Sequence, residues 1–112
     1  MDVVTIKRFD ICLVNLDPTM GSEIKKTRPA VVISPDSMNL SRLNTIIITP
    51  MTSRIRADFP TRVDITFKKK KGQIALDQLR AIDRSRIIKL LGHLDEETQN
   101  NVLNILAIMF DR

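Results

Sequence analysis

The chain has 112 residues, of which 43% are hydrophobic, and this length suits one domain with a core but is too short for two ordinary domains. Eighteen Lys and Arg against thirteen Asp and Glu give a formal charge of +5, which favours a polyanionic partner without identifying one. A lone cysteine, Cys12, excludes an internal disulfide, and no leader-like or bilayer-length apolar run occurs, so we expect a single domain over residues 1–112 in a reducing cytoplasm.

Short apolar runs bounded by turn residues predict the first strands. Residues 11–16 form such a run, and the polar stretch 19–28 after it predicts a long loop. Residues 30–34, which lie between Pro29 and Pro35, and residues 45–49, which end at Pro50, are β-branched runs typical of buried strands. Residues 62–67 alternate polar with apolar, as expected for a strand with one face in water.

The second half of the chain predicts a turn, a strand and a helix. Residues 68–72 are expected to close a turn, and residues 73–83 to form one central strand with a bulge or bend. Asp95 is an expected helix N-cap, because acidic residues follow it and an amphipathic pattern begins there. The expected stripe is Val102, Leu103, Leu106, Met109 and Phe110. This order predicts a mainly β protein with some helix (α+β), built as a small bent antiparallel barrel with a C-terminal amphipathic helix.

The sequence resembles the MazF/PemK/Kid toxin family over roughly residues 8 to 110. Several short blocks in the family's order and spacing carry this resemblance. They are Asp10-Ile11, Leu16-Asp17-Pro18, Gly21-Ser22-Glu23, Thr27 to Ser34, Pro50-Met51-Thr52-Ser53 and Asp77 to Asp83. The sequence departs from the family where Ala75 replaces an arginine of some members and where Ala81 replaces a common threonine.

The resemblance implies an SH3-like or CcdB-like barrel and a function. Members are toxins of type II toxin–antitoxin systems that cut single-stranded RNA at specific sequences and so inhibit translation and growth. It implies that no metal or other cofactor takes part, and the Asp and Glu residues of this chain show no close metal-ligand spacing. It also implies three partners: single-stranded RNA, a cognate acidic antitoxin of the MazE/PemI kind, and a second copy of the chain. Ile105 and Ile108 widen the apolar stripe of the last helix, which also favours a homodimer.

By the same resemblance, Arg28 and Thr52 match the family's catalytic arginine and threonine. An arginine supplies positive charge to the transition state of phosphodiester cleavage, and a hydroxyl can orient the phosphate. Glu23 lies in the loop that the family uses as a mobile cover, where a carboxylate suits a base or an orienting partner of Arg28. By composition alone, each of these side chains also suits an ordinary surface, turn or loop role.

The expected RNA-binding residues are Ser22, Ser53, Asp77 and Gln78. Asp77 and Gln78 are polar positions on the expected central strand, where they suit either hydrogen bonds to bases or structural hydrogen bonds. We interpret His93 as structural, because it lies outside the matching blocks.

Two other functions suit the same fold. The first is a non-enzymatic gyrase-poisoning toxin of the CcdB type, but that family depends on a Trp-Gly-Ile tail and this chain ends Met109-Phe110-Asp111-Arg112. The second is a catalytically silent nucleic-acid-binding module, which is favoured if Arg28 or Thr52 points into the core.

Overall fold

A computed structural model of the protein describes residues 5–112, and residues 1–4 lie outside the described part of the chain. The strands are β1 (Asp10–Asn15), β2 (Thr27–Val32), β3 (Thr45–Thr52), β4 (Arg62–Phe67), β5 (Lys70–Ala75), β6 (Arg80–Asp83) and β7 (Ile87–His93). The helices are α1 (Asp36–Asn39) and α2 (Glu96–Met109), with short 3-10 turns η1 (Leu76–Gln78) and η2 (Arg84–Arg86).

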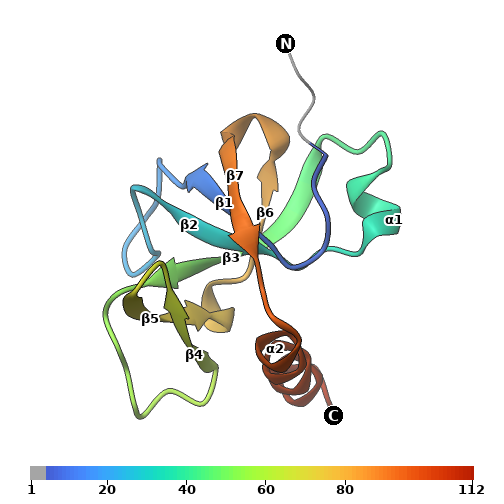
Figure 1. The fold of residues 1–112 in the computed structure, drawn as a ribbon. Helices are drawn as coiled ribbons and strands as arrows, with labels where there is room; N and C mark the ends of the chain where they lie inside the picture. Colours follow the sequence, from blue (N-terminus) through green and yellow to red (C-terminus); the bar gives the residue numbers. More distant parts are fainter. Residues whose placement is uncertain (1–4) are drawn as a thin grey trace.

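All strand pairs are antiparallel, and they form one strongly bent sheet in the order β4-β5-β3-β2-β1-β7. The remaining strand, β6, pairs with the first half of β3 (Figure 1). Helix α2 lies below the sheet, beyond the end of β7. The expectation of a small bent antiparallel β fold with a C-terminal amphipathic helix is confirmed.

Strand β3 changes its partner partway along one edge. Its first half pairs with β6 up to Ile48↔Arg80, and its end pairs with β5 from Met51↔Ile74. Pro50 lies between these two segments, and a proline fits there because it has no N–H for a ladder hydrogen bond. The buried Thr49 hydroxyl donates to the Ala75 carbonyl at 2.5 Å and so ties β3 to the end of β5 at the switch. The residues after Pro50 therefore lie in the part of the sheet that contains β5, whereas those before it lie beside β6.

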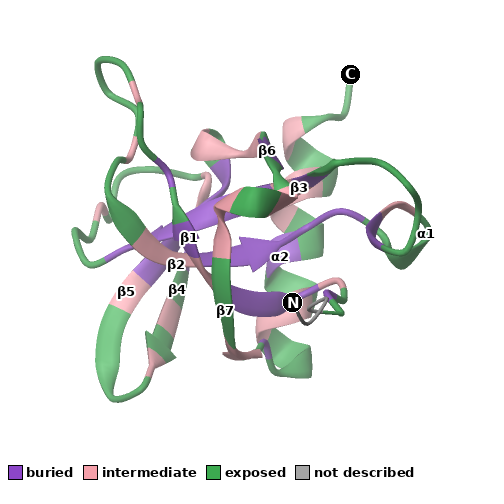
Figure 2. Cartoon of the chain, turned by 90° about the horizontal axis from the view of Figure 1, so that it is seen from above, coloured by how far each residue is buried: buried purple, intermediate pink, exposed green. Residues whose placement is uncertain are grey.

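Two apolar clusters lie on opposite faces of β1 and β2. One contains Ile11 and Val31 and receives Val102 from α2, whereas the other contains Cys12 and Val32. Because both faces are covered, β1 and β2 read as nearly continuous apolar runs rather than as alternating ones. Figure 2 shows the resulting burial of the central strands and the exposure of the β4–β5 hairpin tip. Burial also raises the pKa of the Cys12 thiol to about 12, with a smaller contribution from nearby Asp10, so this cysteine is an unreactive core residue.

Strand β4 and the N-cap of α2 agree with the sequence prediction. Strand β4 spans Arg62–Phe67, and the Asp95 side chain accepts a hydrogen bond from the Thr98 N–H at 2.8 Å. The predicted stripe of α2 was wrong in part. Ile105 packs against the core in company with Val102, Leu106 and Met109, whereas Leu103 and Phe110 are exposed.

Several predicted bounds were wrong. Residues 73–83 form no single strand, since η1 separates β5 from β6, and the turn before them is shorter than predicted because β5 begins at Lys70. Strand β2 begins at Thr27 and contains Pro29, which pairs with β1 before pairing with β3 begins at Ala30↔Pro50. Strand β7 and helix α1 were not predicted.

Candidate active site

Arg28 lies at the start of β2, where the loop that follows β1 enters the sheet. It pairs with Val14 of β1, and its side chain is half-buried. Its Nε donates a hydrogen bond to the Lys25 carbonyl at 2.7 Å, which leaves both terminal nitrogens of the guanidinium for a ligand. The arginine is therefore held at its base and open at its tip.

Thr52 ends β3 and is 9% exposed. Its Oγ1 accepts a hydrogen bond from the Arg54 N–H at 3.1 Å. A threonine hydroxyl has one hydrogen to donate, and in this arrangement that hydrogen is not used by Arg54. The side chain can therefore donate to a ligand while its orientation is fixed by the backbone that follows it.

Arg28, Thr52 and Ser53 line one hollow of about 220 Å³, although they come from different parts of the sequence. We call it the Arg28–Thr52 hollow. Its remaining lining residues are Pro29, Met51, Phe67, Lys70, Lys71 and Gly72. Two lysines and an arginine around an apolar floor make this hollow suited to a phosphate with an attached base.

Gly72 allows β5 to approach Thr52 closely. A Cβ atom at this position would lie 2.7 Å from the Thr52 carbonyl oxygen, which real Cβ atoms do not tolerate. Neighbouring Gln73 pairs with Thr52 across the β3–β5 ladder. The placement of Thr52 thus depends on a glycine that the sequence prediction did not single out.

A second hollow adjoins the first, and Thr52 lines both. We call it the Ser22–Asp77 hollow. It is lined by Ser22, Ile24, Thr52, Arg54, Arg56, Phe59, Arg62, Asp77 and Gln78. Three of the four predicted RNA-binding residues therefore lie here, and the fourth, Ser53, lies in the Arg28–Thr52 hollow.

Asp77 and Gln78 lie on η1 and not on a strand as predicted. The Asp77 carboxylate accepts hydrogen bonds from Arg62 Nε at 2.7 Å and from Thr61 Oγ1 at 3.0 Å. Partial burial opposes ionisation of Asp77, but these hydrogen bonds outweigh it and hold its pKa below the usual value. Asp77 is thus an ionised carboxylate with partners inside the protein.

The Gln78 amide fastens the loop between β1 and β2. Its Oε1 accepts from the Ile24 N–H at 3.1 Å, and its Nε2 donates to the Ser22 carbonyl at 3.5 Å. In the same loop, Glu23 Oε1 accepts from the Met20 N–H at 2.6 Å. Glu23 lines a hollow with Gln78 but is absent from the lining of the Arg28–Thr52 hollow, and no hydrogen bond or ion pair among the described residues joins it to Arg28. The structure therefore brings Arg28 and Thr52 together and leaves Glu23 apart from them.

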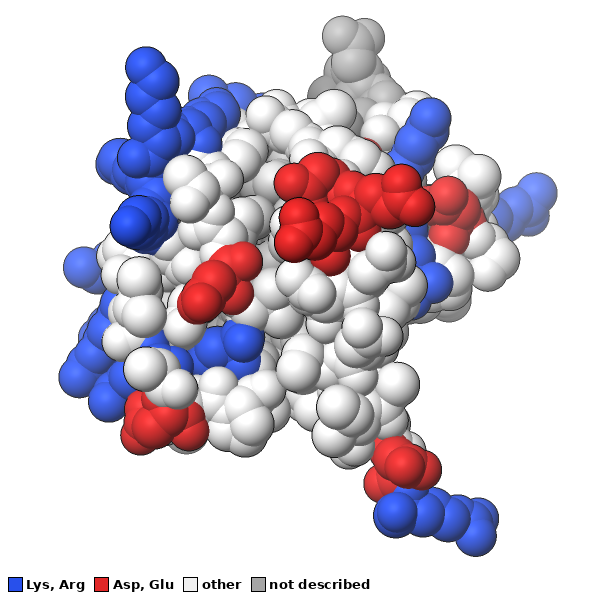
Figure 3. All heavy atoms as spheres, turned by 60° about the horizontal axis from the view of Figure 1, so that its bottom comes forward, with Lys and Arg blue, Asp and Glu red and all other residues white. Residues whose placement is uncertain are grey.

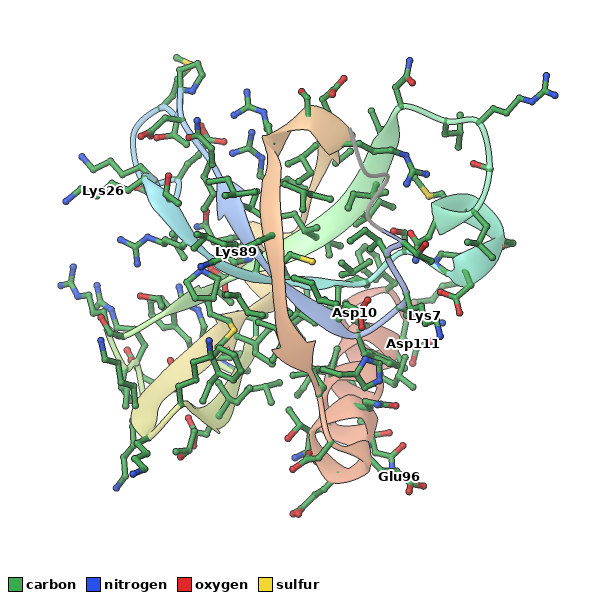
Figure 4. The ribbon with its side chains drawn as sticks, turned by 45° about the horizontal axis from the view of Figure 1, so that its top comes forward. Lys7, Asp10, Lys26, Lys89, Glu96 and Asp111 are labelled. Carbon is green, nitrogen blue, oxygen red and sulfur yellow. The ribbon has the colours of Figure 1, made fainter. Side chains whose placement is uncertain are left out.

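The Arg28–Thr52 hollow and the Ser22–Asp77 hollow are each lined by more basic than acidic side chains. In Figure 3, Lys and Arg side chains are most numerous on the left of the face shown, with smaller groups on the right, and the largest group of acidic side chains lies near the centre. The first turn of α2 contains Glu96 and Glu97. Figure 4 shows Lys26 projecting outward beside the start of β2, whereas Glu96 projects from α2 at the other end of the molecule. A polyanion is therefore attracted to the β2 side.

Within residues 5–112, no group of three or more His, Cys, Asp or Glu side chains is placed to hold a metal ion. His93 Nδ1 lies 2.8 Å from Asp10 Oδ1, and its Nε2 lies 3.3 Å from the Gln99 amide nitrogen. These contacts connect β1, β7 and α2, which supports the structural interpretation of His93. No helix in this part of the chain is long and apolar enough to cross a membrane.

The sequence prediction also missed the loop between β3 and β4. It contributes Arg54, Arg56 and Phe59 to the Ser22–Asp77 hollow. The available signal was one aromatic residue close to several arginines in a nine-residue loop, which is a pattern common to RNA-binding surfaces.

Comparisons with known proteins agree on one family. The family model of the PemK-like, MazF-like toxin of type II toxin-antitoxin systems matches residues 7–110. Among solved structures, MazF from Deinococcus radiodurans is 25% identical, with 96% of this chain and 97% of that chain covered and a TM-score of 0.82.

Two mycobacterial structures have the same fold. An endoribonuclease from a mycobacterial species, solved with its cognate antitoxin, is 16% identical over 96% of this chain and 98% of that one, with a TM-score of 0.77. The Mycobacterium tuberculosis toxin MazF-mt6 is 17% identical over 91% and 96%, with a TM-score of 0.76. Since the family model covers nearly the whole chain, this protein belongs to the PemK-like, MazF-like toxin family of type II toxin–antitoxin systems.

Proposed function

We propose that this toxin is an endoribonuclease that cuts single-stranded RNA at specific sequences without a metal ion, and that it thereby inhibits translation and growth. One observation carries the proposal: Arg28 and Thr52, 24 positions apart in the sequence, line the same basic hollow. The mycobacterial endoribonuclease of the same fold supports it. A gyrase poison gains no support, because the family model is that of the PemK-like and MazF-like toxins.

The proposed reaction replaces the bond from phosphorus to the 5′-oxygen with a bond from phosphorus to the 2′-oxygen, so the 2′-OH loses its proton and the leaving 5′-oxygen gains one. It begins with attack of a ribose 2′-OH on the adjacent phosphate. Two negative charges then gather on the phosphorane-like transition state, and the open tip of the Arg28 guanidinium can donate paired hydrogen bonds to its oxygens. The Thr52 hydroxyl donates its one hydrogen to another phosphate oxygen. Threonine is a poor base at its ordinary pKa, so we assign Thr52 to phosphate binding and not to proton removal.

We also propose Glu23 as a catalytic carboxylate, but this role requires the loop between β1 and β2 to move. Its carboxylate is bound to the Met20 N–H in this structure and lines a different hollow from Arg28. Glu23 would act on the phosphate only after the loop between β1 and β2 has moved, which requires breaking the hydrogen bonds that join Gln78 to Ile24 and Ser22. Ser22, Ser53, Asp77 and Gln78 are proposed to line the RNA path on either side of Thr52.

The proposed metal independence is tested with purified protein and a long single-stranded RNA in excess chelator. We expect the same cleavage rate with and without chelator, and we expect the fragment ends to share a short sequence word. Loss of cleavage in chelator that magnesium restores would contradict the proposal. Fragment ends at random positions would contradict the proposed sequence specificity but not the proposed nuclease activity.

We further propose that the toxin is a homodimer. Leu103 is 38% exposed, and Ile108 and Phe110 at the end of α2 are 72% and 71% exposed. On β7, Ile88 and Leu90 are also about half exposed. Apolar side chains of this size, on two elements that follow each other in the chain, suit burial against a second copy.

The type II system implies an antitoxin partner. We propose that the toxin-binding segment of the antitoxin is acidic and occupies the Arg28–Thr52 hollow and the Ser22–Asp77 hollow. The net charge of +5 and the basic side chains of the Arg28–Thr52 hollow suit carboxylates as well as phosphates. The loop between β1 and β2 is displaced in this proposal, and breaking its hydrogen bonds with Gln78 is part of the free-energy cost of that displacement.

Light scattering tests both partner proposals in one titration. The toxin alone should have twice the monomer mass of 12.8 kDa at micromolar concentration. An acidic antitoxin peptide should bind and increase the mass, and the fraction of toxin in this complex should fall as the salt concentration rises. A non-cleavable RNA analogue should displace the peptide. A monomeric toxin, or a complex that binds peptide and RNA together, would contradict the respective proposal.

A further inference from the structure

We propose that Arg56 and Phe59, in the loop of residues 53–61 between β3 and β4, form a nucleotide subsite beside Thr52. The base of one unpaired nucleotide that flanks the cleaved bond stacks on this pair, and its phosphate binds the Arg56 guanidinium. This inference deepens the proposed RNA cleavage and rests on it. Gln73, which is buried below the loop, is the residue that positions the subsite.

Phe59 is an aromatic side chain in contact with cations and open to solvent. It is 37% exposed, and its ring centroid lies 5.2 Å from Arg56 Cζ and 5.0 Å from Arg62 Cζ. It lines the Ser22–Asp77 hollow together with Thr52. A partly exposed ring held by guanidinium groups next to a phosphate-binding threonine offers the stacking surface that unpaired bases use.

The charge of this hollow suits a phosphate. Its lining contains Arg54, Arg56 and Arg62 against a single carboxylate, Asp77. Asp77 is paired with Arg62, and no carboxylate of the described residues lies within ion-pair distance of Arg54 or Arg56. Two guanidinium groups therefore remain without a counter-charge beside the hollow, and a phosphate oxygen can accept hydrogen bonds from them.

Gln73 holds the backbone of Arg56 at both polar atoms. This side chain is 3% exposed, and its Oε1 accepts from the Arg56 N–H at 3.0 Å, whereas its Nε2 donates to the Arg56 carbonyl at 3.4 Å. The same Nε2 donates to Asp64 Oδ1 on β4 at 2.9 Å. Because Gln73 also pairs with Thr52 in the β3–β5 ladder, one buried residue fixes Arg56 relative to the catalytic strand.

Binding to a non-cleavable RNA tests the subsite separately from catalysis. The probe is a fluorescent single-stranded RNA of the cleaved sequence with 2′-deoxyribose at the attacked nucleotide, and each flanking position is made abasic in turn. We expect Phe59→Leu to weaken binding by about 5- to 150-fold, the range of one base–aromatic stack. One abasic position should weaken wild-type binding similarly and should cause little further loss in Phe59→Leu.

Salt dependence separates the phosphate contact from the stack. Arg56→Gln should lower the slope of log affinity against log salt by about 0.7, the value for one phosphate contact on a single strand, and Phe59→Leu should leave that slope unchanged. Arg42→Gln is the matched control, because Arg42 is an exposed arginine in the loop between α1 and β3 and lines none of these hollows. It should leave both the affinity and the slope near the wild-type values.

Gln73→Met tests positioning with nearly the same side-chain volume. It should weaken binding of the intact probe but not of the probe that is abasic at the Phe59-dependent position, a distinction that a general loss of structure would not produce. Thermal unfolding checks the fold, and if Gln73→Met fails to fold, the exposed-loop variants decide the outcome.

The proposal is overturned if Phe59→Leu binds as tightly as Arg42→Gln, or if each abasic position costs the same in Phe59→Leu and in the wild type. If no all-ribose RNA is cut, the proposed nuclease fails and no cleaved sequence defines the probe. Phe59→Leu and Arg42→Gln are then compared for binding to a single-stranded RNA of mixed sequence and to its fully abasic form, and equal binding by the two variants would overturn the subsite as well.

Discussion

Arg28→Ala should lower the rate of RNA cleavage by about 10²–10³, the usual cost of removing one donor that stabilises a transition state. The guanidinium is half-buried, its Nε is bound to the Lys25 carbonyl, and its tip faces a hollow that holds no carboxylate. The substitution should not unfold the protein, since the side chain makes no ion pair in the described residues. The measurement is the single-turnover cleavage rate, with Arg42→Ala as the control for loss of one positive charge.

Substitution of Thr52, which lines the same hollow as Arg28, tests the proposed site independently. Thr52→Val keeps the shape of this nearly buried side chain and removes the hydroxyl, so cleavage should fall strongly, whereas Thr52→Ser should retain most of it. If both Arg28→Ala and Thr52→Val cut RNA at near wild-type rates, the site is wrong even though the family is right.

Gly72→Ala should impair both stability and cleavage. The added Cβ would lie 2.7 Å from the backbone oxygen of Thr52, and backbone cannot yield as a flexible side chain does. Overpacking of this kind costs about 1–3 kcal/mol, and a shift of about 1 Å at a catalytic group can cost about 10²-fold in rate. The melting temperature and the cleavage rate are measured on the same preparation.

Gly21→Ala is the matched control for this change. Gly21 has a φ of +54°, so alanine there is strained, but its Cβ would meet no atom within 4 Å. It should therefore lower stability modestly and leave Thr52 in place. An unchanged melting temperature and rate in Gly72→Ala would show that the close approach of β5 does not set the position of Thr52.

The strands that have a clear local sequence pattern could be predicted. The predicted bounds were wrong where contacts between distant parts of the chain determine where a strand begins or ends. The alternation of residues 62–67 located β4, and the acidic turn after Asp95 located the start of α2. The continuation of β3 through Pro50 depends on β5, a partner that begins 20 residues later, and no local pattern indicates it. Strand β7 was missed because it pairs with β1, more than seventy residues earlier in the chain.

The candidate site divides in the same way. Arg28 and Thr52 were expected from the family resemblance, and the structure lines one hollow with both. Asp77 was placed on a strand, but its hydrogen bonds come from Thr61 and Arg62, and long-range side-chain pairs of this kind leave no periodic signal. Gln73 was read only as a strand residue, because its hold on Arg56 exists only after β5 and the loop before β4 have come together.

The chemistry of the cleaved ends tests the central proposal most directly. Purified toxin is incubated in excess chelator with a defined single-stranded RNA, and the two ends at the cleaved bond are identified by mass. Attack by the 2′-OH predicts a 2′,3′-cyclic phosphate on one fragment and a 5′-hydroxyl on the other, and it predicts no cleavage when the attacked nucleotide carries 2′-deoxyribose. A 3′-hydroxyl with a 5′-phosphate, or cleavage of the 2′-deoxy substrate at the same bond, would contradict the mechanism built on Arg28 and Thr52.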